Sequence, residues 1–172
     1  MMEKKAPKDC CGAMIAPKID TISTMDAMIA IDHFKKLLPC DQFIITGSFG
    51  WKLLGLVQNV KDLDIILVNP TESAMNSLDA LREPNNSDYP ANPNQYKVKF
   101  GTLIIDFYVK KTKIDTIDLA NGLSIASIKG TIRAKKQYGR MKDFYQLSAI
   151  ASIFCTRKEL VSAIEKEQSK YV

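Results

Sequence analysis

Two aspartates separated by one residue open a strand-like segment in the first half of the chain. Asp62 and Asp64 lead into residues 63–68, LDIILV, a nearly continuous apolar run that is typical of a buried strand. Side chains two positions apart on a strand point to the same side of a sheet. Like charges held side by side repel each other, and a cation or a proton relieves that repulsion. The spacing therefore favours a metal site.

A third carboxylate, Asp106, stands inside the apolar segment 102–110, TLIIDFYVK. Charged side chains are seldom found in such strands without a partner. A salt bridge to a nearby lysine is one explanation. The other is that Asp106 joins Asp62 and Asp64 in an all-oxygen site, which suits Mg²⁺ better than zinc. Two such ions can hold a triphosphate and lower the pKa of an attacking hydroxyl.

A Gly-Ser pair, Gly47 and Ser48, follows the strand-like residues 43–46 and precedes a short amphipathic helix. Glycine lets backbone approach a ligand closely, serine adds a hydroxyl, and unpaired N–H groups at the helix start attract anions. Alone, such a pair is usually only a turn. Beside three carboxylates, it is where the β- and γ-phosphates of a nucleotide would bind, and the chemistry indicated is phosphoryl-group transfer.

Taken together, these residues resemble the motif of the DNA polymerase β-like nucleotidyltransferase superfamily. That motif is a Gly-Ser at a strand-to-helix turn, an Asp-x-Asp on the next strand and a third carboxylate on a later strand. The later segment from Lys135 to Asp143, KKQYGRMKD, is similar to one in small bacterial and phage-type members. These include AbiEii-like abortive-infection nucleotidyltransferases and antibiotic-modifying enzymes. The resemblance covers roughly residues 25–150.

The resemblance implies an α+β fold, a nucleotidyltransferase-like mixed β-sheet flanked by helices, with a C-terminal helical extension. It implies transfer of a nucleoside monophosphate from an NTP to an acceptor hydroxyl, with release of pyrophosphate. Two Mg²⁺ ions would be held by the three catalytic aspartates, and Asp106 would also help to deprotonate the acceptor. Gly47 and Ser48 would hold the triphosphate. The acceptor stays open between a small molecule, a protein and an RNA, and a protein partner is possible.

Three basic residues of the later segment have two interpretations. Lys135, Arg140 and Lys142 approach the nucleotide or an acidic partner in one interpretation. In the other, Arg140 and Lys142 pair with Asp143 or with helix-end carbonyls, and the segment only docks the C-terminal helices.

Other functions share parts of the pattern. Metal-dependent glycosyltransferases also carry an Asp-x-Asp, and some nucleases use three carboxylates, but neither needs the upstream Gly-Ser. A catalytically inactive protein of the same fold could instead bind nucleic acid or a protein. Residues 129–172 hold ten Lys or Arg against four Asp or Glu, which favours that alternative weakly.

Composition indicates one globular domain of 172 residues, with 46% hydrophobic and 25% charged residues. No apolar run reaches the roughly 18 residues of a membrane span, and the N-terminus lacks the apolar core of a secretory signal. We expect a cytoplasmic protein that does not bind membranes. Its four cysteines, Cys10, Cys11, Cys40 and Cys155, lack metal-site spacing and are expected to be reduced thiols.

The expected organisation is a flexible arm over residues 1–19, a catalytic core over 20–118 and a helical region packed on it over 119–172. A capping box at Ser23 and Asp26 predicts a helix up to Leu38. A second helix is predicted over 71–82, a loop over 83–94 and a hairpin over 96–110 around Gly101. After Asp115 the spacing of isoleucines predicts helices, with Gly139 and Thr156 as breaks.

Overall fold

The structure is a computed structural model that describes residues 21–84 and 93–153. A single mixed sheet organises this part of the chain, with the strand order β3-β4-β2-β1-β6-β5. Its strands are β1 (Gln42–Thr46), β2 (Leu63–Val68), β3 (Gln95–Phe100), β4 (Leu103–Lys110), β5 (Thr116–Asp118) and β6 (Ser124–Ala126). The pairs β2–β4 and β1–β6 are parallel, and the other neighbours are antiparallel.

Five helices accompany the sheet in the described ranges. They are α1 (Thr24–Leu37), α2 (Gly47–Leu53), α3 (Glu72–Leu81), α4 (Ile128–Tyr138) and a last helix that runs from residue 141 to 153, where the described chain ends. We refer to the last one as helix 141–153. The expected α+β fold, a mixed sheet flanked by helices, is confirmed. None of the helices in the described ranges is long and apolar enough to cross a membrane.

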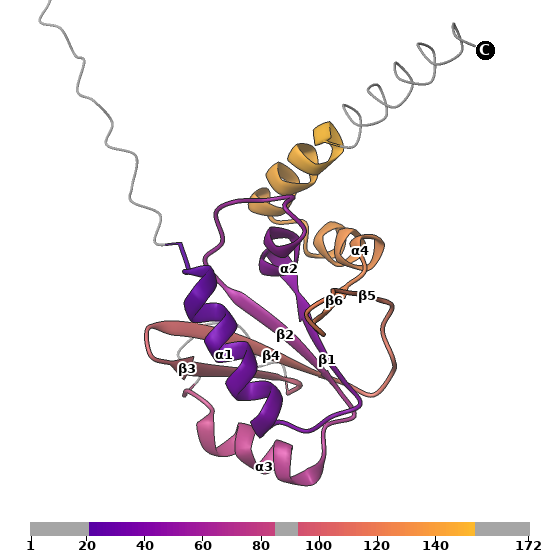
Figure 1. Ribbon diagram of the computed structural model, residues 1–172. Coiled ribbons are helices and arrows are strands. Elements are labelled where there is room, and N and C mark those ends of the chain that lie inside the picture. The colour runs from indigo at the N-terminus through magenta and orange to yellow at the C-terminus, as the bar shows by residue number, and fades with distance from the viewer. Residues whose placement is uncertain (1–20, 85–92, 154–172) are drawn as a thin grey trace, which may run out of the picture.

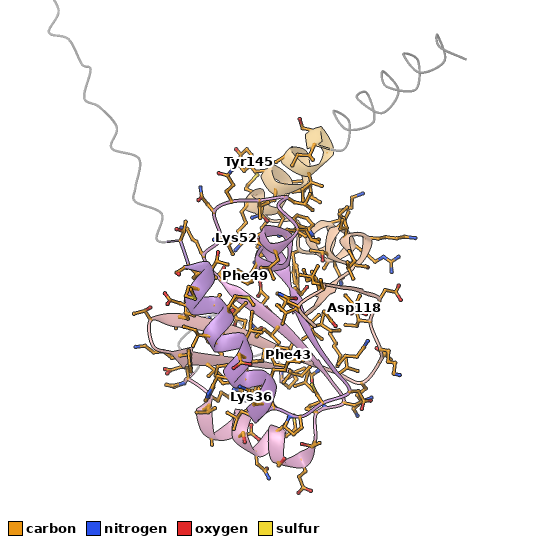
Figure 2. The ribbon with its side chains drawn as sticks, in the orientation of Figure 1. Lys36, Phe43, Phe49, Lys52, Asp118 and Tyr145 are labelled. Atoms are coloured by element: carbon orange, nitrogen blue, oxygen red, sulfur yellow. The ribbon has the colours of Figure 1, made fainter. Side chains whose placement is uncertain are left out.

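Helix α1 covers one face of the sheet (Figure 1). It begins where the capping box predicts, since the Ser23 hydroxyl accepts a hydrogen bond from the Asp26 backbone N–H. Phe34 is buried on the face of α1 that turns toward the strands. Phe49 of α2 joins the same core and is labelled in Figure 2, between α1 and α2. Burial of this apolar surface is the main term that stabilises the layer.

Strand alternation decides what the opposite face of the sheet carries. The odd-numbered residues of β2 and β4 pack in the core under α1: Leu63, Ile65, Leu67, Leu103, Ile105 and Phe107. Because successive strand side chains alternate between faces, Asp64 of β2 and Asp106 of β4 lie on the other face. The exposed Lys97, Lys99 and Ile104 belong to that face as well. The sheet therefore presents both aspartates on the side that α1 leaves open.

The prediction that the chain is helical after Asp115 is wrong for residues 116–126. Strands β5 and β6 form a hairpin there, and β6 pairs in parallel with β1. Ile125, which has helical spacing to Ile128, is a buried strand residue. Strands of three residues are too short to show alternation, and the turn signal at Asn121-Gly122, where Gly122 has φ +75°, was missed.

The remaining predicted elements are confirmed where the structure describes them. Helix α3 is capped by the Thr71 hydroxyl, the β3–β4 hairpin turns at Gly101, and Gly139 ends α4 in the left-handed conformation. The arm over 1–19, most of the 83–94 loop and the Thr156 break lie outside the described residues. So do three of the cysteines, whereas Cys40 is described and has a free thiol.

Candidate functional site

Two of the predicted aspartates are direct neighbours across the sheet. Asp64 and Asp106 are register partners on the parallel strands β2 and β4. The Tyr108 hydroxyl donates to Asp64 Oδ1 at 3.4 Å, and Gln95 Nε2 donates to Asp106 Oδ1 at 3.1 Å. No lysine of the described ranges forms an ion pair with Asp106, so the salt bridge considered for it is not formed there.

The acidic pair carries negative charge that its surroundings neutralise only in part. Burial raises the pKa of Asp64 to about 6, and the charges of Asp106 and Asp62 add to the effect. Burial also raises the pKa of Tyr108, again assisted by the two adjacent carboxylates. Lys135 and Lys142 act in the opposite direction on Asp64, but they do not outweigh these causes. A cation placed here would relieve the repulsion.

The Gly-Ser turn lies directly against the acidic pair. Gly47 begins α2 itself and has φ +63°, which L side chains rarely adopt. A Cβ added to Gly47 would overlap Oδ2 of Asp64 and lie 2.9 Å from its Cγ. Only glycine therefore lets the backbone of the turn touch this carboxylate. The structure brings together the two parts of the motif that the sequence separates by 17 positions.

Asp62 lies just before β2 and is more exposed than Asp64. Its Oδ2 is 3.8 Å from Nζ of Lys142, and both side chains are more than half exposed. An ion pair of that kind contributes little to stability because water screens it. Lys142 thus reaches the acidic site from helix 141–153 and does not pair with Asp143.

Lys135 and Arg140 instead meet at Asp143. Lys135 Nζ lies 3.2 Å from Asp143 Oδ1, and Arg140 Nε lies 2.7 Å from its Oδ2. Burial alone would raise the pKa of Asp143, but the hydrogen bonds from Arg140 and Lys135 outweigh it and lower that pKa. Lys135 is itself buried, with its ammonium 5.1 Å from the ring centroid of Trp51. Arg140 thus has the docking contact considered for it. Lys135 of α4, for which no pairing with Asp143 was predicted, shares the same buried carboxylate of helix 141–153.

Ser48 is linked to the same helix. Its hydroxyl donates to Gln146 Oε1 at 3.1 Å, and Lys135 Nζ donates to that oxygen at 2.6 Å. The predicted phosphate-binding serine is therefore held by a side chain from the C-terminal helical region.

The residues present suit a magnesium ion in their chemistry. Asp62, Asp64 and Asp106 offer carboxylate oxygens only, the ligands that Mg²⁺ prefers, and the charge on Asp64 is incompletely compensated. In the described ranges, however, no three acidic, histidine or cysteine side chains are gathered into a group that could hold a metal. Asp62 pairs with Lys142 and Asp106 with Gln95. Binding a metal would exchange such partners for the ion.

Three polar residues of the site were missed by sequence reasoning. Tyr108 had a usable signal, because it stands two positions after Asp106 and therefore on the same face of β4. Gln95 comes from the neighbouring strand, and Gln146 is 98 positions from Ser48. Neither glutamine has a local signal in the sequence.

Comparisons with known proteins give little beyond this geometry. No protein-family model matches the chain, and no curated protein matches it. A solved structure from Thermotoga maritima, described as a "putative nucleotidyltransferase", is similar over 77% of this chain and 97% of its own, with 10% identity and a TM-score of 0.44. A likeness at this level carries no argument about activity.

Proposed function

We propose that the chain is a nucleotidyltransferase that moves a nucleoside monophosphate from an NTP to an acceptor hydroxyl. One observation carries the proposal: the Gly47-Ser48 turn packs against Asp64, which is in register with Asp106. The turn that we propose to bind phosphate and the two neighbouring aspartates thus lie side by side. Transfer of a nucleotide from a triphosphate can use that combination, because metal-assisted phosphoryl chemistry depends on positioning and on charge compensation.

Each residue has a defined task in this proposal. Gly47 allows the backbone to approach the triphosphate, and the Ser48 hydroxyl donates to one of its oxygens. Asp62, Asp64 and Asp106 would hold two Mg²⁺ ions, which would neutralise the triphosphate and lower the pKa of the acceptor hydroxyl. Lys142, which pairs with Asp62 in the structure, would exchange that partner for a phosphate oxygen of the nucleotide.

The bond changes are those of an in-line displacement. The acceptor oxygen forms a bond to the α-phosphorus while the bond from that phosphorus to the α–β bridging oxygen breaks. The acceptor proton passes to Asp106, and pyrophosphate leaves. The acceptor class proposed is a hydroxyl on a small molecule, a protein or an RNA, and the protein is proposed to act in the cytoplasm.

The proposal is tested by isothermal titration with ATP, GTP, CTP and UTP, each with and without Mg²⁺. The test variant is Asp62→Asn/Asp64→Asn, and Asp115→Asn in an exposed loop is the matched control. We expect Mg²⁺-dependent binding of at least one nucleotide by the wild type and the control, and none by the double variant. A well-folded wild type that binds none of the four would refute the proposal.

A second candidate function is non-catalytic binding of nucleic acid or of a protein partner. One observation favours it: α4 exposes a basic stripe of Lys129, Arg133 and Lys136. Large apolar side chains are exposed close to it in sequence, namely Tyr138, Met141, Phe144 and Tyr145, the last of which is labelled in Figure 2. A salt-dependent affinity for any duplex that Asp64→Ala leaves unchanged would support this function over the first.

A further inference from the structure

Gln146 lies between the proposed phosphate-binding serine and a buried lysine, and the lysine fixes how its amide is turned. Lys135 carries an ammonium, which only donates hydrogen bonds. The Gln146 atom at 2.6 Å from Lys135 Nζ must therefore be the carbonyl oxygen. Ser48 Oγ then donates to the same oxygen, at 3.1 Å. Both acceptor positions of Oε1 are occupied, and the amide cannot flip without placing N–H against the ammonium.

The other end of this amide has no partner within the described part of the chain. Gln146 Nε2 takes part in no hydrogen bond there, and it is not among the buried polar atoms that lack a partner. It therefore keeps two N–H donors that solvent can reach. A cation bound to the oxygen of an amide polarises the whole group and strengthens its N–H donors.

The helix points this side chain at the candidate site. Gln146 and Lys142 are four positions apart and share one face of helix 141–153. Lys142 reaches Asp62 and Gln146 reaches Ser48, so that face meets both the acidic part and the Gly-Ser part of the site. Asp143 and Ile150 of the same helix are buried and hold it in place.

We propose that Gln146 is a further phosphate-binding residue, whose Nε2 donates to an oxygen of the triphosphate beside Ser48. The inference rests on the proposed nucleotidyltransferase function and adds a contact to its triphosphate site. In the structure described here Ser48 donates to Gln146, so its hydroxyl must turn toward the phosphate when the nucleotide binds. Lys135 keeps the Gln146 amide in place during that change, which leaves its N–H donors directed away from the buried ion pair.

The test uses the full chain and inorganic tripolyphosphate with Mg²⁺, a probe with no base or sugar. Titration calorimetry compares the wild type with Gln146→Met, which removes both polar ends, and Gln146→Glu, which keeps an oxygen for Lys135 and Ser48 but replaces the donors with a charged acceptor. Gln137→Glu, on the exposed side of α4, is the control for an added charge. Side-chain amide NMR follows the Gln146 NH₂ group directly, assigned by its loss in the Met variant.

We expect the Gln146 NH₂ signals of the wild type to shift in a saturable way as tripolyphosphate is added. Both Gln146 variants should bind tripolyphosphate about tenfold or more weakly than Gln137→Glu, because each loses a hydrogen bond to a charged group. Gln146→Glu should keep the unfolding temperature of the wild type. If Gln146 only docks the helix, Gln146→Glu binds tripolyphosphate as tightly as the control does. The NH₂ signals of Gln146 in the wild-type protein then do not move on titration. That result overturns the inference about Gln146 and leaves the proposed function standing. If the wild type binds neither tripolyphosphate nor any of the four nucleotides, the proposed function fails with it.

Discussion

Replacing Asp64 with Asn should make the protein more stable at alkaline pH, although it removes a proposed metal ligand. Burial, followed by the charges of Asp106 and Asp62, raises the pKa of Asp64 from 3.8 to about 6 in the folded protein. The folded protein thus binds this proton more tightly than the unfolded chain does. The free energy of unfolding therefore falls as the pH rises from about 4 to about 6 and stays lower above that range.

The size of the effect follows from that shift. Two pKa units correspond to about 3 kcal/mol, at about 1.4 kcal/mol for each unit, which we take as an upper figure. Asn is uncharged and keeps an oxygen that can accept from the Tyr108 hydroxyl, now 3.4 Å from Asp64 Oδ1. At pH 8 we expect the free energy of unfolding of Asp64→Asn to be about 1–3 kcal/mol higher than that of the wild type. At pH 4.5 the gain should be about a third as large.

Urea unfolding at pH 4.5 and pH 8, in buffer with EDTA, measures this difference. The fluorescence of Trp51 reports unfolding cleanly, because it is the chain's single tryptophan and is fully buried. The control Asp115→Asn, in an exposed loop, should change the free energy of unfolding by no more than about 0.5 kcal/mol at either pH. The reasoning is refuted if Asp64→Asn is no more stable than the wild type at pH 8, or if its gain is equal at both pH values.

Three further predictions concern the turn and the C-terminal helices. Gly47→Ala should lower the free energy of unfolding, measured with urea, by about 2–4 kcal/mol, because its backbone has a positive φ and the added Cβ would overlap the Asp64 carboxylate. Gly101→Ala is the control, at φ +59° with open space around it, and should lower the same free energy by only about 1 kcal/mol. Equal losses in the two variants would contradict the steric argument. Asp143→Ala leaves Lys135 buried without its carboxylate and should lower the free energy of unfolding, measured by thermal unfolding, by about 3–5 kcal/mol. A loss below about 1 kcal/mol would mean that the ion pair does not dock the helix. Lys142→Ala should leave stability within about 0.5 kcal/mol but weaken Mg²⁺-nucleotide binding severalfold in calorimetry, and unchanged affinity would exclude Lys142 from the phosphate site.

Much of the fold could be read from local patterns. The α1 cap at Ser23, the α3 cap at Thr71 and the hairpin turn at Gly101 each depend on a few adjacent residues. The β5–β6 hairpin could not be read in this way, because its strands have three residues each. The hairpin joins the sheet through the pairing of β6 with β1, about 80 positions earlier. Isoleucine spacing alone favoured a helix there, and tertiary pairing overrode it.

The residues of the candidate site also fall into those that local patterns predict and those that depend on tertiary packing. Sequence reasoning selected Asp64, Asp106 and Gly47, and the structure brings all three together. It left Arg140 and Lys142 between nucleotide binding and pairing with Asp143, and it did not predict that Lys135 pairs with Asp143. Long, flexible side chains pair with whatever carboxylate packing brings near them, so their partners cannot be found from spacing alone.

The sequence by itself determined which side chains share a face, because strand alternation and the conformational freedom of glycine are properties of the local backbone. Only the tertiary structure decided their partners: Gln95 for Asp106, Tyr108 for Asp64 and Gln146 for Ser48. Those contacts join segments up to 98 positions apart, and they exist because β2 and β4 pair in register and helix 141–153 packs beside α2 and α4. No local rule encodes that packing, since it arises from burying the apolar faces of all these elements together.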